Sequence, residues 1–218
     1  MSKKKWAAVD NYIDSILGAT DPALDAALEA VRAAGLPQIS VTASQGKLLH
    51  LLAKLQGAKR IQEIGTLGGY STIWMARALP KNGKLVTIEA DAKHARVAAE
   101  NIARAGLSEK VELRKGKALS VLPELEGPFD LIFIDADKRN NPRYFEWALK
   151  LARKGSLIIV DNVVREGEIL DADSADPDIR GTRKLFELMA AEPRVMAMAQ
   201  QTVGSKGHDG FAIALVTG

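Results

Sequence analysis

The sequence predicts a single α/β domain with a seven-stranded, mostly parallel sheet that ends in an antiparallel hairpin. Three observations support this fold class. Short apolar runs alternate with longer amphipathic segments, glycine-bearing turns follow the first strands, and only a short polar turn separates the last two apolar runs. Such alternation implies right-handed crossovers and a parallel sheet with helices on both faces. We expect residues 1–57 to supply N-terminal helices for a substrate pocket or a dimer contact, and residues 58–218 to form the ligand-binding core.

The segments can be assigned in chain order from their periodicity. Asp21-Pro22 is a typical helix start, and apolar residues recur on one face as far as Ala34-Gly35. The other expected helices are 43–55, 71–79, 92–105, 118–125, one that starts near 141–142, and 178–191. The expected parallel strands are 60–64, 85–89, 111–115, 129–135 and 157–161. The runs 195–203 and 211–216, joined by a turn over 204–210, should form the hairpin.

The composition excludes several classes of protein. The chain has 218 residues, of which 47% are hydrophobic, and a formal net charge of +3. This length suits one domain with a full core. Because cysteine is absent, disulfides and thiolate metal sites are excluded, and the composition suits the cytoplasm. We expect no secretion signal and no membrane span, and the basic excess is too diffuse to indicate nucleic-acid binding.

A glycine-rich turn follows the first strand, in the segment Glu63-Ile64-Gly65-Thr66-Leu67-Gly68-Gly69-Tyr70-Ser71. Its glycines allow a tight turn close to a ligand, and the helix that follows should offer free amide donors. The spacing differs from the dinucleotide-binding pattern, which disfavours a nicotinamide enzyme. The second strand ends on Glu89, where an acid can accept both hydroxyls of a ribose. Each feature alone could be structural, but together they indicate a nucleoside ligand.

Acidic side chains follow two of the predicted strands. Asp135-Ala136-Asp137-Lys138 comes after one apolar run, and Asp161-Asn162 comes after the next. The carboxyl ends of parallel strands share one edge of a sheet, so these groups should converge. Two carboxylates and an amide oxygen suit a hard divalent cation. Asp137 should point to the opposite face, as a structural or cofactor-side partner rather than a metal ligand. The alternative for Lys138 is a solvated lysine near acids.

These motifs resemble those of the cation-dependent O-methyltransferases that use S-adenosylmethionine, the group that includes the catechol and caffeoyl-coenzyme A O-methyltransferases. The resemblance extends from about Ile39 to the C-terminus and implies a Rossmann-like fold. It is carried by Glu63-x-Gly65-Thr66-x-x-Gly69-Tyr70-Ser71, Glu89, Phe133-Ile134-Asp135-Ala136-Asp137-Lys138 and Asp161-Asn162-Val163. It implies methyl transfer to a hydroxyl of a catechol-like small molecule by a homodimeric enzyme.

The resemblance also implies a role for each site position. Asp135, Asp161 and Asn162 would ligate the divalent metal, which in this family is most often magnesium. Lys138 would be the general base. The S-adenosylmethionine contacts would come from Val41, Glu63, Gly65, Thr66, Ser71, Glu89, Ala118 and Asp135.

Some residues depart from the pattern of the resembling family, and other functions stay open. Val41-Thr42-Ala43 lacks the usual proline and acid, and Val164 stands where an aromatic residue is common. Residues 163–178 are rich in acids and could be a solvated loop or a mobile lid. One alternative function is a metal-independent methyltransferase or another nucleoside-cofactor transferase on the same scaffold. A second is a non-catalytic binding module. The three histidines lack a common ligand spacing and are expected at the surface or in packing contacts.

Overall fold

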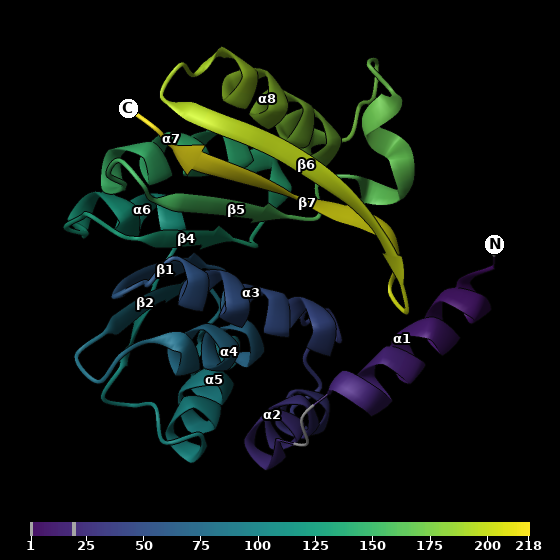
Figure 1. Ribbon diagram of the computed structural model, residues 1–218, viewed down its shortest axis with the longest axis vertical. Helices are drawn as coiled ribbons and strands as arrows, with labels where there is room; N and C mark the ends of the chain where they lie inside the picture. Colours follow the sequence, from purple (N-terminus) through teal and green to yellow (C-terminus); the bar gives the residue numbers. More distant parts are fainter. Residues whose placement is uncertain (1, 19–20) are drawn as a thin grey trace. The chain divides into compact units, whose positions relative to one another are not determined.

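The structure is a computed structural model that describes residues 2–18 and 21–218 (Figure 1). Residues 1, 19 and 20 of the predicted N-terminal segment lie outside the described residues. The chain divides into two compact units: the first comprises Met1–Ile13 and Glu126–Gly218, and the second comprises Asp14–Leu125.

The unit Asp14–Leu125 contains three parallel strands in the order β3-β2-β1. The strands are β1 (Arg60–Ile64), β2 (Lys84–Glu89) and β3 (Val111–Lys115). The helices are α2 (Pro22–Ala33), α3 (Ala43–Leu55), α4 (Tyr70–Ala78), α5 (Ala92–Arg104), α6 (Ala118–Val121) and the 3-10 turn η1 (Leu122–Glu124). The predicted strands and the first four of these helices agree with the structure to within a residue or two at their ends. The helix predicted over 118–125 is wrong in type after Val121, since Pro123 cannot continue the α-helical bonding.

Two aspartates fix where helices of this unit begin. The Asp21 carboxylate accepts hydrogen bonds from the amides of Ala23 and Leu24 at 3.1 and 3.2 Å, and Pro22 occupies the first helical position. At α5, Asp91 accepts from the amides of Lys93 and His94 at 2.7 and 2.9 Å. Both aspartates satisfy backbone donors that have no partner within the helix, so the predicted starts are confirmed for a physical reason.

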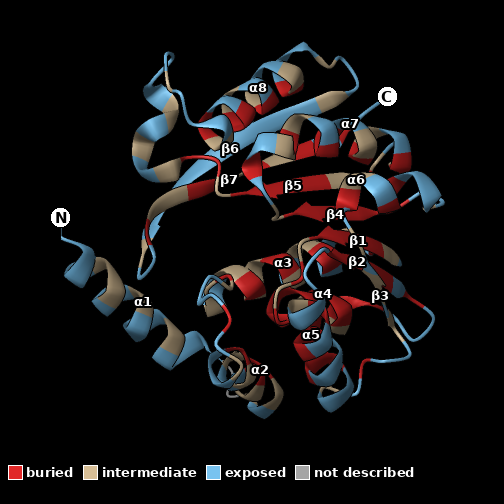
Figure 2. Cartoon of the chain, turned by 180° about the vertical axis from the view of Figure 1, so that it is seen from behind, coloured by how far each residue is buried: buried red, intermediate tan, exposed pale blue. Residues whose placement is uncertain are grey.

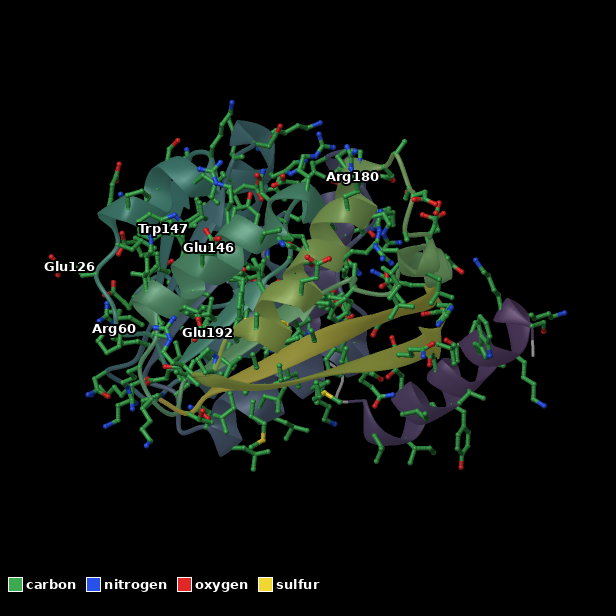
Figure 3. The ribbon with its side chains drawn as sticks, turned by 90° about the horizontal axis from the view of Figure 1, so that it is seen from above. Arg60, Glu126, Glu146, Trp147, Arg180 and Glu192 are labelled. Carbon is green, nitrogen blue, oxygen red and sulfur yellow. The ribbon has the colours of Figure 1, made fainter. Side chains whose placement is uncertain are left out.

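The unit that ends at Gly218 contains the strands in the order β4-β5-β7-β6. These are β4 (Leu131–Ile134), β5 (Leu157–Asp161), β6 (Val195–Gly204) and β7 (Gly207–Val216). Its helical segments are η2 (Lys138–Asn140), α7 (Asn141–Leu151), η3 (Arg165–Leu170) and α8 (Pro177–Ala191). β4 and β5 are parallel, whereas β7 is antiparallel to both β5 and β6. In Figure 3, Glu146 and Trp147 mark α7, and Arg180 and Glu192 mark the two ends of α8.

The hairpin and the N-terminus differ from the sequence-based expectation. The predicted turn over 204–210 is wrong, because residues 207–210 pair with residues 201–204 and leave only Ser205 and Lys206 in the turn. The predicted strand over 129–135 is shorter, at Leu131–Ile134. Helix α1 (Lys3–Leu17) was not among the helices assigned from periodicity, although residues 1–57 were expected to supply helices, and none of its residues is buried.

The predicted fold class is confirmed. The seven strands follow the order β3-β2-β1-β4-β5-β7-β6, mostly parallel, with the antiparallel hairpin at the C-terminus. Figure 2 shows β4 and β5 buried, whereas the edge strand β6 is exposed over most of its length. In the part of the chain that the structure describes, no helix combines the length and the apolar character that a membrane crossing requires.

Candidate functional site

The glycine-rich turn lies between β1 and α4, and its backbone explains its sequence. Gly65 and Gly69 have φ of +93° and +81°, conformations that side chains disfavour. Leu67 also has a positive φ, of 51°. At Gly68, a β-carbon would come within 2.1 Å of Val31 on α2, so this glycine permits close helix packing. The turn is therefore tightly specified by both backbone conformation and packing.

Glu89, at the end of β2, holds this turn in place. Its Oε2 accepts hydrogen bonds from the amides of Thr66 and Leu67 at 3.1 and 2.8 Å, and its Oε1 accepts from the amide of Asp91 at 2.9 Å. The amides of Thr66 and Leu67, which precede the helix whose free amides were expected to bind a ligand, are therefore already hydrogen-bonded to Glu89. Glu89 is the acid that was expected to accept the ribose hydroxyls. His94 Nδ1 lies 3.7 Å from Glu89 Oε1, a contact that histidine spacing could not reveal. Glu89 orders the turn and presents one buried carboxylate there.

The other predicted cofactor residues of this unit are mostly buried. Glu63 is fully buried and accepts hydrogen bonds from Ser71 Oγ at 2.6 Å and from Thr72 Oγ1 at 2.5 Å. Thr66 Oγ1 lies 2.5 Å from Thr87 Oγ1. The buried residues Val41 and Ala118 lie before α3 and at the start of α6. The structure thus places Glu63, Thr66, Ser71 and Glu89 around one turn, whereas Val41 and Ala118 belong to other segments of the unit.

The two acidic motifs lie at the carboxyl ends of β4 and β5. Ile134 pairs with Val160 in the parallel register, so Asp135 and Asp161 are the next residues on neighbouring strands. Asp161 is 4% exposed, whereas the Asp135 side chain is 24% exposed. The juxtaposition expected from the strand pattern is therefore present, with two carboxylates on adjacent strand ends.

Lys138 is paired with the first of these acids. Its Nζ donates a hydrogen bond to Asp135 Oδ1 at 2.8 Å, and the residue is 6% exposed. The alternative of a solvated lysine is wrong, because the residue is buried. A buried ammonium needs a charged partner to offset its lost hydration, and Asp135 is that partner. This amine is held beside the strand ends and shielded from solvent.

The short 3-10 turn that carries Lys138 is fixed by its neighbours. Asp137 accepts from Asn140 Nδ2 at 2.5 Å and from the Tyr144 hydroxyl at 2.6 Å. Burial raises the pKa of Tyr144, and the bond to Asp137 raises it further. The Arg139 amide and its Nε both donate to Asp178 Oδ1, each at 3.1 Å. These contacts favour the structural alternative for Asp137 and set the position of Lys138.

Asn162 turns the chain sharply after β5. Its φ is +57°, a left-handed conformation that asparagine tolerates better than most residues. The chain is then held by β7: the Val163 amide donates to the Gly210 carbonyl at 3.0 Å, and Asp209 Oδ1 accepts from the amides of Val164 and Arg165 at 3.0 and 3.1 Å. The amide side chain of Asn162 is thus carried by a fixed, left-handed turn next to Asp161.

The chemistry of this set fits a divalent cation. No group of three or more His, Cys, Asp or Glu side chains suited to a metal occurs among the described residues. The predicted set contains two carboxylates and one amide, and it supplies only oxygen ligands of the kind that Mg²⁺ prefers. Mg²⁺ usually keeps several waters and takes few protein ligands, so three such residues would be sufficient.

Lys206 is a further charged residue near this site that the sequence did not single out. Burial lowers the pKa of Lys206, while the carboxylates of Asp135 and Asp161 act on its ammonium in the opposite direction. In the sequence, Lys206 falls in the polar turn predicted over 204–210, where a lysine is usually a solvent-exposed residue without a specific role. Its relation to the acids depends on hairpin geometry that periodicity does not encode.

Comparison with known proteins agrees with this geometry. The sequence profile of a family described as O-methyltransferase matches residues 7–214. The chain belongs to the O-methyltransferase family. A catechol O-methyltransferase of Niastella koreensis is 52% identical over 220 residues, covering 99% of this chain and 100% of that protein. A catechol O-methyltransferase of Mycobacterium tuberculosis is 54% identical over 209 residues, covering 95% of this chain and 94% of that protein.

A solved structure extends the comparison to three dimensions. An O-methyltransferase from Bacillus cereus, crystallised in complex with SAH, is 55% identical and superposes with a TM-score of 0.98. The superposition covers 99% of this chain and 100% of that one. The expected family and the enzymatic character of this O-methyltransferase are confirmed.

Proposed function

We propose that this O-methyltransferase transfers the methyl group of S-adenosylmethionine to a hydroxyl of a catechol-like aromatic, with the help of a divalent metal, most readily Mg²⁺. The observation that carries the proposal is the pair of acids on adjacent strand ends, Asp135 and Asp161, with buried Lys138 bonded to the first. The catechol O-methyltransferases that the chain resembles at 52% and 54% identity support the acceptor class. The SAH-bound relative supports the methyl donor.

The proposed ligands of the metal are Asp135, Asp161 and Asn162. When bound there, the cation would supply positive charge that favours the ionised form of an acceptor hydroxyl, whose unperturbed pKa is near ~10. Lys138, which is buried and donates a hydrogen bond to Asp135, would take or electrostatically offset the departing proton. Asp135 is also proposed to lie near the donor's ammonium group. The chain's own task is to fix these groups in place before reaction.

The methyl donor is proposed to bind at the glycine-rich turn. Glu89 would accept the ribose hydroxyls with oxygens that already order the turn amides. Glu63, Gly65, Thr66 and Ser71 would contact the methionine part. Val41 would pack on the donor, and the Ala118 backbone would face the adenine. These roles follow from the family resemblance and from the burial of most of these side chains.

A metal-dependence assay tests this function directly. Purified protein would be given S-adenosylmethionine and catechol with Mg²⁺, and again after treatment with a chelator. We expect methyl transfer with Mg²⁺, loss on chelation and recovery on adding Mg²⁺ back. Transfer that survives chelation would instead favour the metal-independent alternative, and binding of the donor without transfer to any catechol would favour the non-catalytic module.

We also propose that the protein works as a cytoplasmic homodimer. The edge strand β6 exposes Met196, Met198 and Val203, and α1 exposes Tyr12 and Ile16. Exposed edge strands and clustered apolar side chains are typical of association surfaces. Light scattering should give twice the chain mass, and Met196→Glu with Met198→Glu should shift the protein toward the monomer. A wild-type monomer at micromolar concentration would contradict the dimer.

The cytoplasmic assignment is supported by the lack of cysteine.

A further inference from the structure

The β6–β7 hairpin extends past the strand end that carries the proposed metal ligands. Asp161, the last residue of β5, pairs with Phe211 of β7. Residues 207–210 of β7 continue beyond this pair and are bonded to residues 201–204 of β6. The tip of the hairpin therefore overhangs the carboxyl end of β5, as Figure 1 shows. Its turn consists of Ser205 and Lys206 alone.

This overhanging tip is held by contacts from two other segments. The Ser205 amide donates to Asp10 Oδ2 of α1 at 2.7 Å. Glu166 Oε1, in the segment that follows Asn162, accepts from the His208 amide at 3.3 Å and from Lys3 Nζ at 3.2 Å. The bond to Lys3 lowers the pKa of Glu166. Hydrogen bonds from backbone amides therefore hold the chain on both sides of Lys206, at Ser205 and at His208.

The charge of Lys206 acts where the acceptor is proposed to bind. Lys206 lies in the turn of the hairpin that extends past Asp161, and the carboxylates of Asp135 and Asp161 both act electrostatically on its ammonium. When a divalent cation occupies the site, it offsets the negative charge of these carboxylates. The ammonium then has less negative charge to balance it within the protein. A second anionic group on the acceptor would restore that balance, whereas a cationic group would be repelled.

We propose that Lys206 is a specificity-determining residue that favours catechol-like acceptors bearing a second anionic group, such as a carboxylate, over neutral or cationic ones. The inference rests on the proposed function, because it needs an acceptor placed at Asp135 and Asp161. It adds a role for a hairpin-turn residue in choosing among acceptors that present the same pair of hydroxyls.

The test uses three acceptors that differ mainly in charge: protocatechuate, its methyl ester and dihydroxybenzylamine. For the wild-type enzyme we expect the lowest KM for the carboxylate and the highest for the amine. Lys206→Met should raise the KM for protocatechuate about fivefold or more, equivalent to roughly 1 kcal/mol, and leave the KM for the ester within about twofold. Lys206→Glu should favour the amine over the carboxylate, and Lys206→Arg should keep the wild-type order.

Two controls make the outcome specific. Lys154→Glu changes the same charge in the exposed turn that precedes β5, at the opposite end of that strand, and should leave the order of the three acceptors unchanged. Calorimetry of acceptor binding to the enzyme with SAH and Mg²⁺ should show the same selective loss without turnover. If Lys206→Glu changed the KM of all three acceptors equally, the proposed role of Lys206 would be overturned, but the proposed function would not. Failure of the wild-type enzyme to methylate any of the three would overturn the proposed function as well.

Discussion

Gly181 on α8 lies directly against the backbone of Lys138. A β-carbon at Gly181 would come within 2.3 Å of the Lys138 carbonyl oxygen and 2.7 Å of the Arg139 α-carbon. Because both neighbours are backbone atoms, they cannot move aside as the end of a flexible side chain could. The absence of a side chain at Gly181 is therefore part of how Lys138 reaches Asp135.

Gly181→Ala should displace the turn that carries Lys138. We expect a loss of about 1–3 kcal/mol in the free energy of unfolding, as for other overpacked sites, and a fall in kcat with little change in SAH affinity. Urea denaturation, calorimetry and steady-state kinetics measure the three effects. Ala190→Ser, near the exposed end of the same helix, is the matched control and should change none of them. Unaltered stability and kcat in Gly181→Ala would show that this contact is unimportant.

Lys138 can be tested as a base rather than as a charge alone. Lys138→Met should lower kcat by about 10²–10⁴, the usual contribution of a positioned acid or base. Lys138→Arg keeps the positive charge but cannot accept the proton at neutral pH, so it should stay nearly as slow. Lys150→Met, on the exposed face of α7, serves as the control. Recovery of most of the rate by Lys138→Arg would mean that Lys138 acts only through its charge.

The strand ends and the chemistry around them were predictable because they depend on local sequence. An apolar run followed by Asp135 or Asp161 indicates both a buried parallel strand and the edge where its carboxylate lies. The caps at Asp21 and Asp91 were equally local, since they act on amides two and three residues away.

The features that were missed depend on contacts between residues far apart in sequence. Gly181 and Lys138 are brought together by helix packing, and Lys206 is brought toward Asp135 by the length and pairing of a hairpin. The polar composition of residues 204–210 indicated a long turn, but backbone pairing with residues 201–204 continues the strand through it. A glycine or lysine in such a place carries no periodic signal.

Glu89 should support both stability and donor binding. In Glu89→Ala, the amides of Thr66, Leu67 and Asp91 would lose their acceptor, so we expect a loss of about 1–3 kcal/mol in the free energy of unfolding. SAH affinity, measured by calorimetry, should fall as well. Glu109→Ala, an exposed acid of the same unit, should affect neither quantity. Normal SAH affinity in a destabilised Glu89→Ala protein would limit Glu89 to a structural role.

Asn162 has two separable properties, its left-handed backbone and its amide oxygen. Asn162→Gly keeps access to a φ of +57°, so it should retain stability to within about 1 kcal/mol and yet bind Mg²⁺ or Mn²⁺ more weakly in calorimetry. Asn162→Val forces a β-branched residue into that conformation and should cost about 1–3 kcal/mol in unfolding free energy measured without metal. If Asn162→Gly binds the metal as tightly as wild type, the amide is not a ligand. If Asn162→Val is as stable as wild type, the left-handed turn does not depend on the residue at this position.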